Sequence, residues 1–281
     1  MLTSAPVPGS PFNTTGPNAA GVVAALLEAR TGQQIATDRA WRLDTALKPL
    51  IRERGLDTLD DLVRDLLAGA DPLLSDRVVD ALLNQETSFF RDPAVFDLLG
   101  EVVAASATDR RYRIWSAGCS TGQEPLSLAM LLAEREAGPH EILATDVSDG
   151  ALARARAGRY TQFEIQRGLP VRRMIRWFEP ADPDWRAKPE LMRHVAFRRV
   201  NLVADPAPAG RFDLVLCRNV LLYLAPAQRA AVFDRLAAAL RPGGLLLLGA
   251  GETVIGQTDA FAPSTRWRGL YEATGGRARR A

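Results

Sequence analysis

The feature that most constrains the fold is an alternation of short apolar runs with helical patterns after residue 111. Strands are expected where apolar residues run almost without a break, in residues 112–117, 141–147, 195–200, 212–217 and 245–248. Helices are expected between them, in residues 123–135, 149–157 and 226–240. Apolar strands that alternate with helices are typical of a parallel sheet covered on both faces. The sequence therefore predicts an α/β, Rossmann-like fold.

The sequence before this alternation shows no strand pattern. Residues 1–20 hold four prolines and little periodicity, which predicts a disordered tail. Residues 21–83 carry apolar side chains at helical spacing, and Thr58, with Asp61 three positions later, offers an N-cap. We expect an all-helical N-terminal domain there.

Two further boundaries follow from changes in pattern. Residues 84–111 are expected to form a connecting helical segment, and residues 112–281 a second domain. Within that domain, residues 158–193 interrupt the alternation and are rich in arginine and aromatic side chains. This stretch predicts a small inserted subdomain.

Composition excludes several classes of protein. The chain is 47% hydrophobic and 24% charged, which is ordinary for a soluble globular protein, and no run reaches the ~18 apolar residues of a membrane span. Residues 1–18 lack the basic flank of a signal peptide, so we expect a cytoplasmic protein without membrane insertion. Two cysteines and two histidines argue against a disulfide framework and a metal site.

Charge is distributed unevenly along the chain. Residues 151–281 hold 22 basic and 11 acidic residues, net +11, so this half could face nucleic acid or an acidic protein. No basic motif interleaved with aromatic residues appears, and we therefore expect no nucleic-acid partner.

The first expected strand ends in Gly118-Cys119-Ser120-Thr121-Gly122, and the second ends at Asp146. Glycines between a strand and a helix allow close approach of a ligand, and an acid at the next strand end is where such sheets bind ribose hydroxyls. The same residues are equally compatible with a plain turn and a helix N-cap. On these residues alone, nucleotide binding and a purely structural role both stay open.

A third interpretation comes from the same loop, because it matches the GxSxG nucleophile elbow of α/β hydrolases. Ser120, Asp182 and His194 would even follow the required order. That enzyme class places the elbow in the middle of a longer sheet, however, and would leave Asp146 without a role.

Several longer motifs resemble one known family. Residues 85–92, Gln-Glu-Thr-Ser-Phe-Phe-Arg-Asp, resemble the Asn-Glu-Thr-x-Phe-Phe-Arg signature of chemotaxis-receptor glutamate methyltransferases, the CheR-type family. Similar matches to its cofactor loop, its ribose-binding strand end and its later motifs occur in residues 115–125, 144–148, 201–202, 217–223 and 240–244. The resemblance covers roughly residues 22–271 and is more specific than the GxSxG pentapeptide.

The resemblance implies transfer of a methyl group from S-adenosylmethionine to glutamate side chains on the cytoplasmic domain of methyl-accepting chemoreceptors, for adaptation in bacterial chemotaxis. The cofactor-binding residues it implies are Gln85, Thr87, Arg91, Gly118, Glu124, Asp146, Asn201, Leu202, Arg218 and Asn219. It implies that Glu124 anchors the polar end of the cofactor and Asp146 its ribose. Asn201 and Leu202 are expected to border the adenine, while Arg91 and Tyr223 are the expected catalytic residues.

The chemistry agrees with this set of residues. A glutamate, with a reference pKa of ~4.3, is already ionised at neutral pH and needs no general base to attack a sulfonium methyl. Catalysis can then rest on alignment, which supplies up to ~7–11 kcal/mol in well-oriented systems. Arg91 or Arg218 is expected to hold the substrate carboxylate, with Tyr223 donating a hydrogen bond to it.

Some positions depart from the family pattern. Gln85 stands where Asn is frequent, Leu126 where an aromatic residue is common, and Ala46 where the helix thought to face the receptor usually has Arg. Some members grip a C-terminal receptor peptide through a glycine-rich loop of the inserted subdomain, but residues 174–186 contain no glycine. We predict a monomer that does not depend on such a peptide. Alternatives are the same chemistry on another protein, or a cofactor-binding signalling module without turnover.

Overall fold

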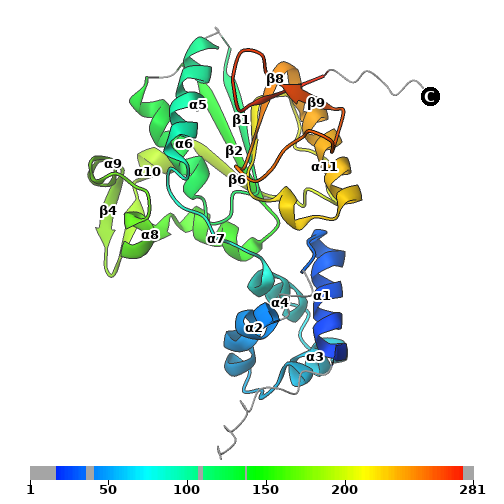
Figure 1. Ribbon diagram of the computed structural model, residues 1–281. Helices are drawn as coiled ribbons and strands as arrows, with labels where there is room; N and C mark the ends of the chain where they lie inside the picture. The colour runs from blue at the N-terminus through cyan, green and yellow to red at the C-terminus, as the bar shows by residue number, and fades with distance from the viewer. Residues whose placement is uncertain (1–16, 36–40, 107–109, 137, 275–281) are drawn as a thin grey trace, which may run out of the picture. The chain divides into compact units, whose positions relative to one another are not determined.

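The computed structural model describes residues 17–35, 41–106, 110–136 and 138–274, which divide into one compact unit ending at Leu83 and another beginning at Asn84 (Figure 1). Residues 1–16 of the predicted tail lie outside the described residues. Residues 17–20 are helical, because the first helix begins at Pro17 rather than after residue 20. No helix in the described ranges is long and apolar enough to cross a membrane.

The described part of the first unit is helical. Its helices are α1 (Pro17–Thr31), α2 (Trp41–Glu53), α3 (Leu59–Ala68) and α4 (Leu74–Leu82). Helices α1 and α2 each contact both α3 and α4, and leucine and valine side chains from all four helices form the core between them.

Helix α3 begins with a reciprocal cap. The Thr58 hydroxyl accepts a hydrogen bond from the Asp61 backbone N–H at 3.1 Å, and the Asp61 carboxylate accepts one from the Thr58 N–H at 3.1 Å. Two N–H groups that the helix cannot satisfy internally thereby find acceptors. The predicted N-cap at Thr58 is confirmed.

The second unit is built on a seven-stranded sheet in the order β6-β2-β1-β7-β8-β10-β9. The parallel strands are β6 (Val195–Arg199), β2 (His140–Asp146), β1 (Tyr112–Ala117), β7 (Phe212–Cys217) and β8 (Leu240–Leu248). These agree with the predicted strands to within a few residues, except that β8 begins earlier. Antiparallel β10 (Tyr271–Ala273) and β9 (Phe261–Pro263) extend one edge and were not predicted, because three residues are too short for a periodic signal.

Helices cover both faces of the sheet, as predicted (Figure 1). Ile114 of β1 packs in one cluster with side chains of α5 (Pro93–Ala105), α6 (Gln123–Glu134) and α7 (Asp149–Ala157). The next residue, Trp115, packs in another with α11 (Pro226–Ala239). Successive side chains of a strand point to opposite faces, so one strand contributes to two cores. Within the predicted connecting segment, α5 is helical and residues 84–92, here called the motif segment, are not.

A second, three-stranded sheet lies within the predicted inserted subdomain. Its order is β3-β5-β4, and it is accompanied by three short helices. The elements are β3 (Arg159–Tyr160), α8 (Gln162–Gln166), α9 (Val171–Trp177), β4 (Phe178–Ala181), β5 (Asp184–Ala187) and α10 (Pro189–Met192).

Phe89 of the motif segment connects it to this small sheet. The Phe89 ring packs edge-on against Tyr160 and Phe178, with ring centroids 5.0 and 5.5 Å apart. Gly168 lies so close that a Cβ there would sit 2.1 Å from the Phe89 carbonyl oxygen, and its φ of +96° also requires glycine. The small sheet therefore supports the motif segment directly.

The two histidines stack at the amino ends of β2 and β6, with ring centroids 5.4 Å apart. Burial, and then the charges of His140 and Arg193, lower the pKa of His194 below its usual 6.5. The folded state then binds fewer protons than the unfolded state, so this contribution to stability is complete above about pH 6.5 and is lost as the pH falls through the folded pKa. We expect the melting temperature to fall between about pH 7.5 and about pH 5.5, and to fall less in His194→Gln. Equal losses in thermal unfolding of the two proteins would contradict this expectation.

Candidate active site

Predicted site residues from four strands meet at one edge of the sheet, here called the carboxyl edge. Asp146 ends β2, Gly118 and Arg218 directly follow β1 and β7, and Asn201 lies two residues beyond β6. These strands are parallel and adjacent, so their carboxyl ends lie together. Open α/β sheets bind their ligands at this edge.

The loop after β1 has a backbone that only particular residues can form. Gly118 and Gly122 have φ values of +86° and +95°, and a Cβ at Gly118 would lie 2.4 Å from Cγ2 of Val220. Between them, Ser120 also has a positive φ of 50°, a strained conformation that costs of order 1–3 kcal/mol for a non-glycine residue. Such strain gathers at functional sites, where the surrounding structure maintains it.

Asp146 is held by the two neighbouring loops. Its carboxylate oxygens accept hydrogen bonds from the backbone N–H of Ser120 at 2.8 Å and of Ser148 at 3.0 Å. A carboxylate can accept about four hydrogen bonds, and this residue is only half-buried. Its position and orientation suit the recognition of a ligand's hydroxyl groups.

Glu124 and Arg218 form a pair beneath this edge. Glu124, in the first turn of α6, accepts from the Ser116 hydroxyl at 2.8 Å and from Nη1 of Arg218 at 3.2 Å. The other terminal nitrogen of Arg218 donates to the Asp92 carboxylate at 2.5 Å and to the Arg91 carbonyl at 3.1 Å. Arg218 is 7% exposed. Its guanidinium thus ties the start of α6 to the end of the motif segment.

The motif segment lies against the loops of the carboxyl edge. Gln85 donates through Nε2 to the Ser148 hydroxyl at 3.1 Å, and its carbonyl accepts from the Ser120 hydroxyl at 3.0 Å. Thr87 is half-buried in the same segment. The half-buried Arg91 places Nη1 at 3.5 Å from the Glu86 carbonyl.

The end of the motif segment combines strained backbone conformations with a hydrogen bond to a buried side chain. Phe90 and Asp92 have φ values of 47° and 63°. The Phe90 N–H donates to the buried hydroxyl of Ser127 on α6 at 3.0 Å. The backbone that presents Arg91 is therefore anchored on both sides of that residue.

Asn201 and Leu202 follow β6 in a tight turn. The Asn201 side-chain oxygen accepts from the backbone N–H of Val203 at 2.9 Å and of Ala204 at 3.3 Å. The carbonyl of Leu202 accepts from Arg235 of α11 at 2.7 Å. The turn is thus fixed at the carboxyl edge, beside the end of β2.

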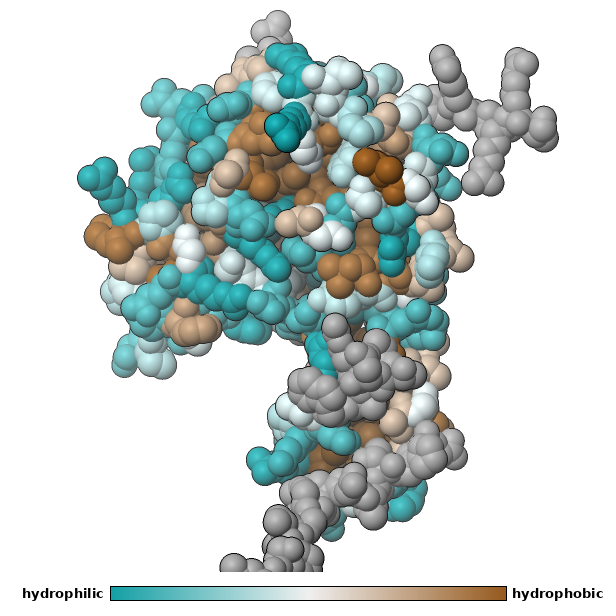
Figure 2. Space-filling model, viewed as in Figure 1, coloured by the Kyte–Doolittle hydropathy of each residue, from teal (hydrophilic) through white to brown (hydrophobic). Residues whose placement is uncertain are grey.

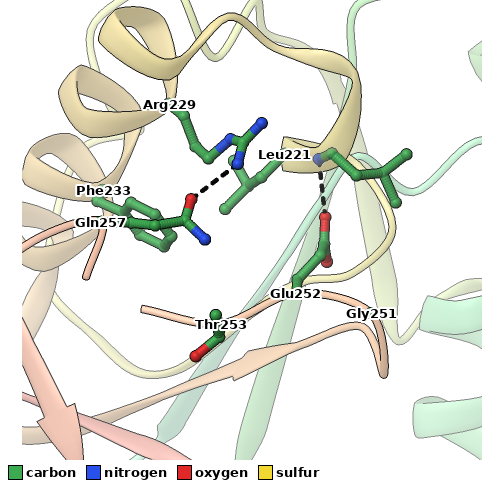
Figure 3. A pocket seen from close by; sticks show the side chains of 8 residues that line it. Leu221, Arg229, Phe233, Gly251, Glu252, Thr253 and Gln257 are labelled. Atoms are coloured by element: carbon green, nitrogen blue, oxygen red, sulfur yellow. Dashed lines mark hydrogen bonds between the residues drawn. The ribbon is translucent and has the colours of Figure 1, made fainter. Parts of the chain in front are cut away.

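Asn219 and Tyr223 belong to the turn between β7 and α11, which includes the short helix η2 (Leu221–Tyr223). The Glu252 carboxylate accepts four backbone N–H groups around this turn: those of Asn219 at 2.7 Å, Gly249 at 2.9 Å, Val220 at 3.0 Å and Leu222 at 3.2 Å. Figure 3 shows Glu252 pointing toward η2, beside a small pocket that Arg229, Phe233 and Gln257 also line. A single side chain therefore organises the turn that carries Tyr223.

Sequence reasoning missed three structurally important residues: Glu252, Ser127 and Asn84, whose side-chain amide contacts Tyr223. Glu252 had a detectable signal, since it follows the last parallel strand by four residues, at the same edge as Asp146. Ser127 lies inside an apolar helix, and its contact with Phe90 spans 37 residues of sequence, so no local pattern marks it.

The geometry contradicts the hydrolase interpretation. Ser120 follows the carboxyl end of β1, whereas His194 directly precedes the amino end of β6. A strand rises about 3.3 Å per residue, so roughly 16 Å of strand separates the two ends, far beyond the ~3 Å that a general base requires. The Ser120 hydroxyl donates instead to the Gln85 carbonyl.

Comparisons with known proteins agree with these motifs. The family model described as CheR methyltransferase, SAM binding domain, matches residues 85–268. The chemotaxis protein methyltransferase of Vibrio parahaemolyticus serotype O3:K6 is 38% identical over 245 residues, which cover 84% of this chain and 89% of that protein. Chemotaxis protein methyltransferase Cher2 of Pseudomonas putida is 35% identical over 248 residues, covering 84% and 90%.

Solved structures show weaker likeness. The S-adenosylmethionine-bound amino pentose methyltransferase CalS10 from Micromonospora echinaspora aligns with a TM-score of 0.36 and 17% identity. The alignment covers 55% of this chain and 49% of that chain.

Proposed function

Since this chain belongs to the CheR methyltransferase family, we propose that its methyl acceptors are glutamate side chains of chemoreceptors. The chain is an S-adenosylmethionine-dependent methyltransferase of chemotaxis, and the proposal concerns the chemical group that it methylates. The observation that supports it most is the state of the titratable groups at the carboxyl edge. Among the described residues, none at this edge is arranged to remove a proton from an acceptor.

The candidate bases and nucleophiles are engaged or buried. Asp146 and Glu124 each accept two hydrogen bonds from groups of the protein. Burial, and then the charges of Asp146 and Glu124, raise the pKa of the Cys119 thiol well above its usual range, and burial does the same for Cys217. A carboxylate acceptor needs neither a base nor a protein nucleophile, because it is ionised at neutral pH.

The residues at this edge fit S-adenosylmethionine. The Asp146 carboxylate, oriented by two backbone N–H groups, would accept hydrogen bonds from the ribose hydroxyls. Gly118, with a φ of +86° and no side chain, would let the backbone approach the cofactor closely. Glu124 would hold the polar end, and Asn201 and Leu202 the adenine. When bound, the cofactor supplies an electrophilic methyl group on a sulfonium centre.

The protein's part in catalysis is to align the acceptor. Arg91 would pair with the acceptor carboxylate, and Tyr223 would donate a hydrogen bond to it. Both side chains are half-buried, so each combines a fixed position with access for a ligand. In contrast, Arg218 is already paired with Glu124 and Asp92, so we propose that it supports the site through those contacts.

The proposal is tested by label transfer. The protein is incubated with S-adenosylmethionine carrying a radiolabelled methyl group and with receptor cytoplasmic fragments. We expect base-labile label, as a methyl ester gives, on glutamates of the fragments and none when those glutamates are replaced with alanine. Label on another protein of the source cell but not on receptors would support the alternative substrate, and cofactor binding without any transfer would support a signalling module.

Tyr223→Phe is expected to lower turnover while leaving cofactor affinity nearly unchanged, because the ring stays and the hydroxyl that would contact the acceptor is lost. The measurement pairs initial rates with titration calorimetry of S-adenosylhomocysteine. A lower melting temperature with normal turnover would instead assign Tyr223 a packing role.

The positive net charge of one stretch of the chain favours a protein partner with an acidic surface. Residues 151–211 hold 13 basic and 6 acidic residues, net +7. Figure 2 shows mostly hydrophilic side chains over this face of the inserted subdomain, with isolated hydrophobic ones among them. We propose that these charges attract the acidic surface of the receptor over the ~8 Å that physiological salt allows. The protein would act in the cytoplasm, as a monomer.

We predict that methylation does not depend on a C-terminal receptor peptide. A peptide that adds to a sheet edge binds through main-chain hydrogen bonds, but Pro180 on the edge strand β4 has no N–H to donate. Deleting the receptor tail should leave the methylation rate within about twofold of that of the intact receptor. Micromolar binding of tail pentapeptides in calorimetry, together with loss of methylation on deletion, would contradict the prediction.

A further inference from the structure

Asn84 begins the second unit, and its side-chain amide contacts Tyr223, which is 139 residues away in the sequence. Nδ2 of Asn84 donates to the Tyr223 phenol oxygen at 2.5 Å, and Oδ1 accepts from the Glu86 backbone N–H at 3.3 Å. The backbone donor determines the orientation of the amide, because only an oxygen can face it. The NH₂ group must therefore face the phenol.

This contact has a consequence for the phenol proton. A tyrosine hydroxyl has one proton to donate and lone pairs with which to accept. Asn84 occupies a lone pair, and no acceptor for the Tyr223 proton occurs among the described residues. The side chain is half-buried at the carboxyl edge, so its proton is left for a ligand.

We propose that Asn84 is a positioning residue that sets the direction of the Tyr223 hydrogen bond, so that the phenol donates to the carboxylate of the methyl acceptor. This inference rests on the proposed function. A carboxylate only accepts hydrogen bonds. One of its oxygens therefore accepts the hydrogen bond from the Tyr223 hydroxyl, while the other oxygen faces the methyl group. Because the amide of Asn84 can only donate at this position, the phenol proton is kept for the substrate.

Asn84→Asp tests the proposal with almost no change in shape. The introduced carboxylate can still accept from the Glu86 N–H, but it presents an oxygen to Tyr223 and would capture the phenol proton. We expect kcat/KM for methyl transfer to fall by about ten- to a hundredfold, as for loss of a hydrogen bond to a charged group. The affinity for S-adenosylhomocysteine and the melting temperature should stay unchanged.

The same substitution in the Tyr223→Phe background separates the hydrogen bond from the added charge. Without the hydroxyl, Asn84→Asp should cause no further loss, so the two substitutions should be strongly non-additive. Asn84→Ala, which removes the amide without adding a charge, should cause a smaller loss than Asn84→Asp. The proposal would be overturned if Asn84→Asp lowered kcat/KM equally in the wild-type and Tyr223→Phe proteins, or if it lowered kcat/KM in neither.

Two reference measurements distinguish this failure from failure of the proposed function. The side-chain amide protons of Asn84, followed by NMR, should shift on Tyr223→Phe, whatever the substrate is. Absence of base-labile glutamyl label from the unaltered protein would refute the proposed function and this inference together. Normal glutamyl labelling, together with additive effects of Asn84→Asp and Tyr223→Phe on kcat/KM, would refute only the role of Asn84.

Discussion

Replacing Asp146 with alanine is expected to weaken S-adenosylmethionine and S-adenosylhomocysteine binding by about ten- to a hundredfold. Hydrogen bonds to a charged group are worth about 1.5–3 kcal/mol, and each 1.4 kcal/mol is a factor of ten in affinity. The substitution removes the hydrogen bonds expected to the ribose, and it also removes the acceptor that orients the Ser120 and Ser148 N–H groups. Both changes lower the affinity for the cofactor. Titration calorimetry measures the change directly.

A matched control lies three residues further along. Asp149 is exposed in the first turn of α7 and pairs only at the surface with Arg199, so Asp149→Ala should leave cofactor affinity unchanged. Asp146→Asn keeps one acceptor oxygen and should give an intermediate loss. Wild-type affinity in Asp146→Ala would remove Asp146 from the cofactor site.

Glu252→Gln is expected to lower both stability and turnover. The amide keeps one acceptor oxygen but turns an NH₂ group toward two of the four backbone donors, leaving those two without an acceptor. At about 1–3 kcal/mol for each unsatisfied group, the melting temperature should drop by roughly 4–12 °C. Because the same turn carries Tyr223, methyl transfer should fall by at least about tenfold even at temperatures where circular dichroism shows a folded protein.

Glu190→Gln provides the comparison for this change. Glu190 is exposed on the short helix α10, so losing its charge should alter neither the melting temperature nor the turnover. A Glu252→Gln protein that melts lower but turns over normally when folded would show that the turn needs no such support for catalysis.

The family and the parallel core were predictable because their signals are local. A buried strand shows as an apolar run of five to seven residues, and β1, β7 and α7 have the predicted bounds. The strand ends then indicate the ligand edge, so Gly118 and Asp146 could be placed before any contact was known. The N-cap at Thr58 could be predicted for the same reason, since its capping partner lies three residues away.

The remaining features depend on contacts between residues far apart in sequence. Glu252 acts on a turn about 30 residues before it, Arg218 reaches Asp92 across 126 residues, and Asn84 reaches Tyr223 across 139. A hydrogen bond depends on where the folded backbone brings a donor and an acceptor together, and no spacing in the sequence encodes that distance or direction. The sequence by itself determined the five parallel strands, the edge at which their carboxyl ends meet and the family, because these signals are local. Only the tertiary structure decided which polar side chains are engaged in hydrogen bonds within the protein, because those contacts join residues that are far apart in the sequence.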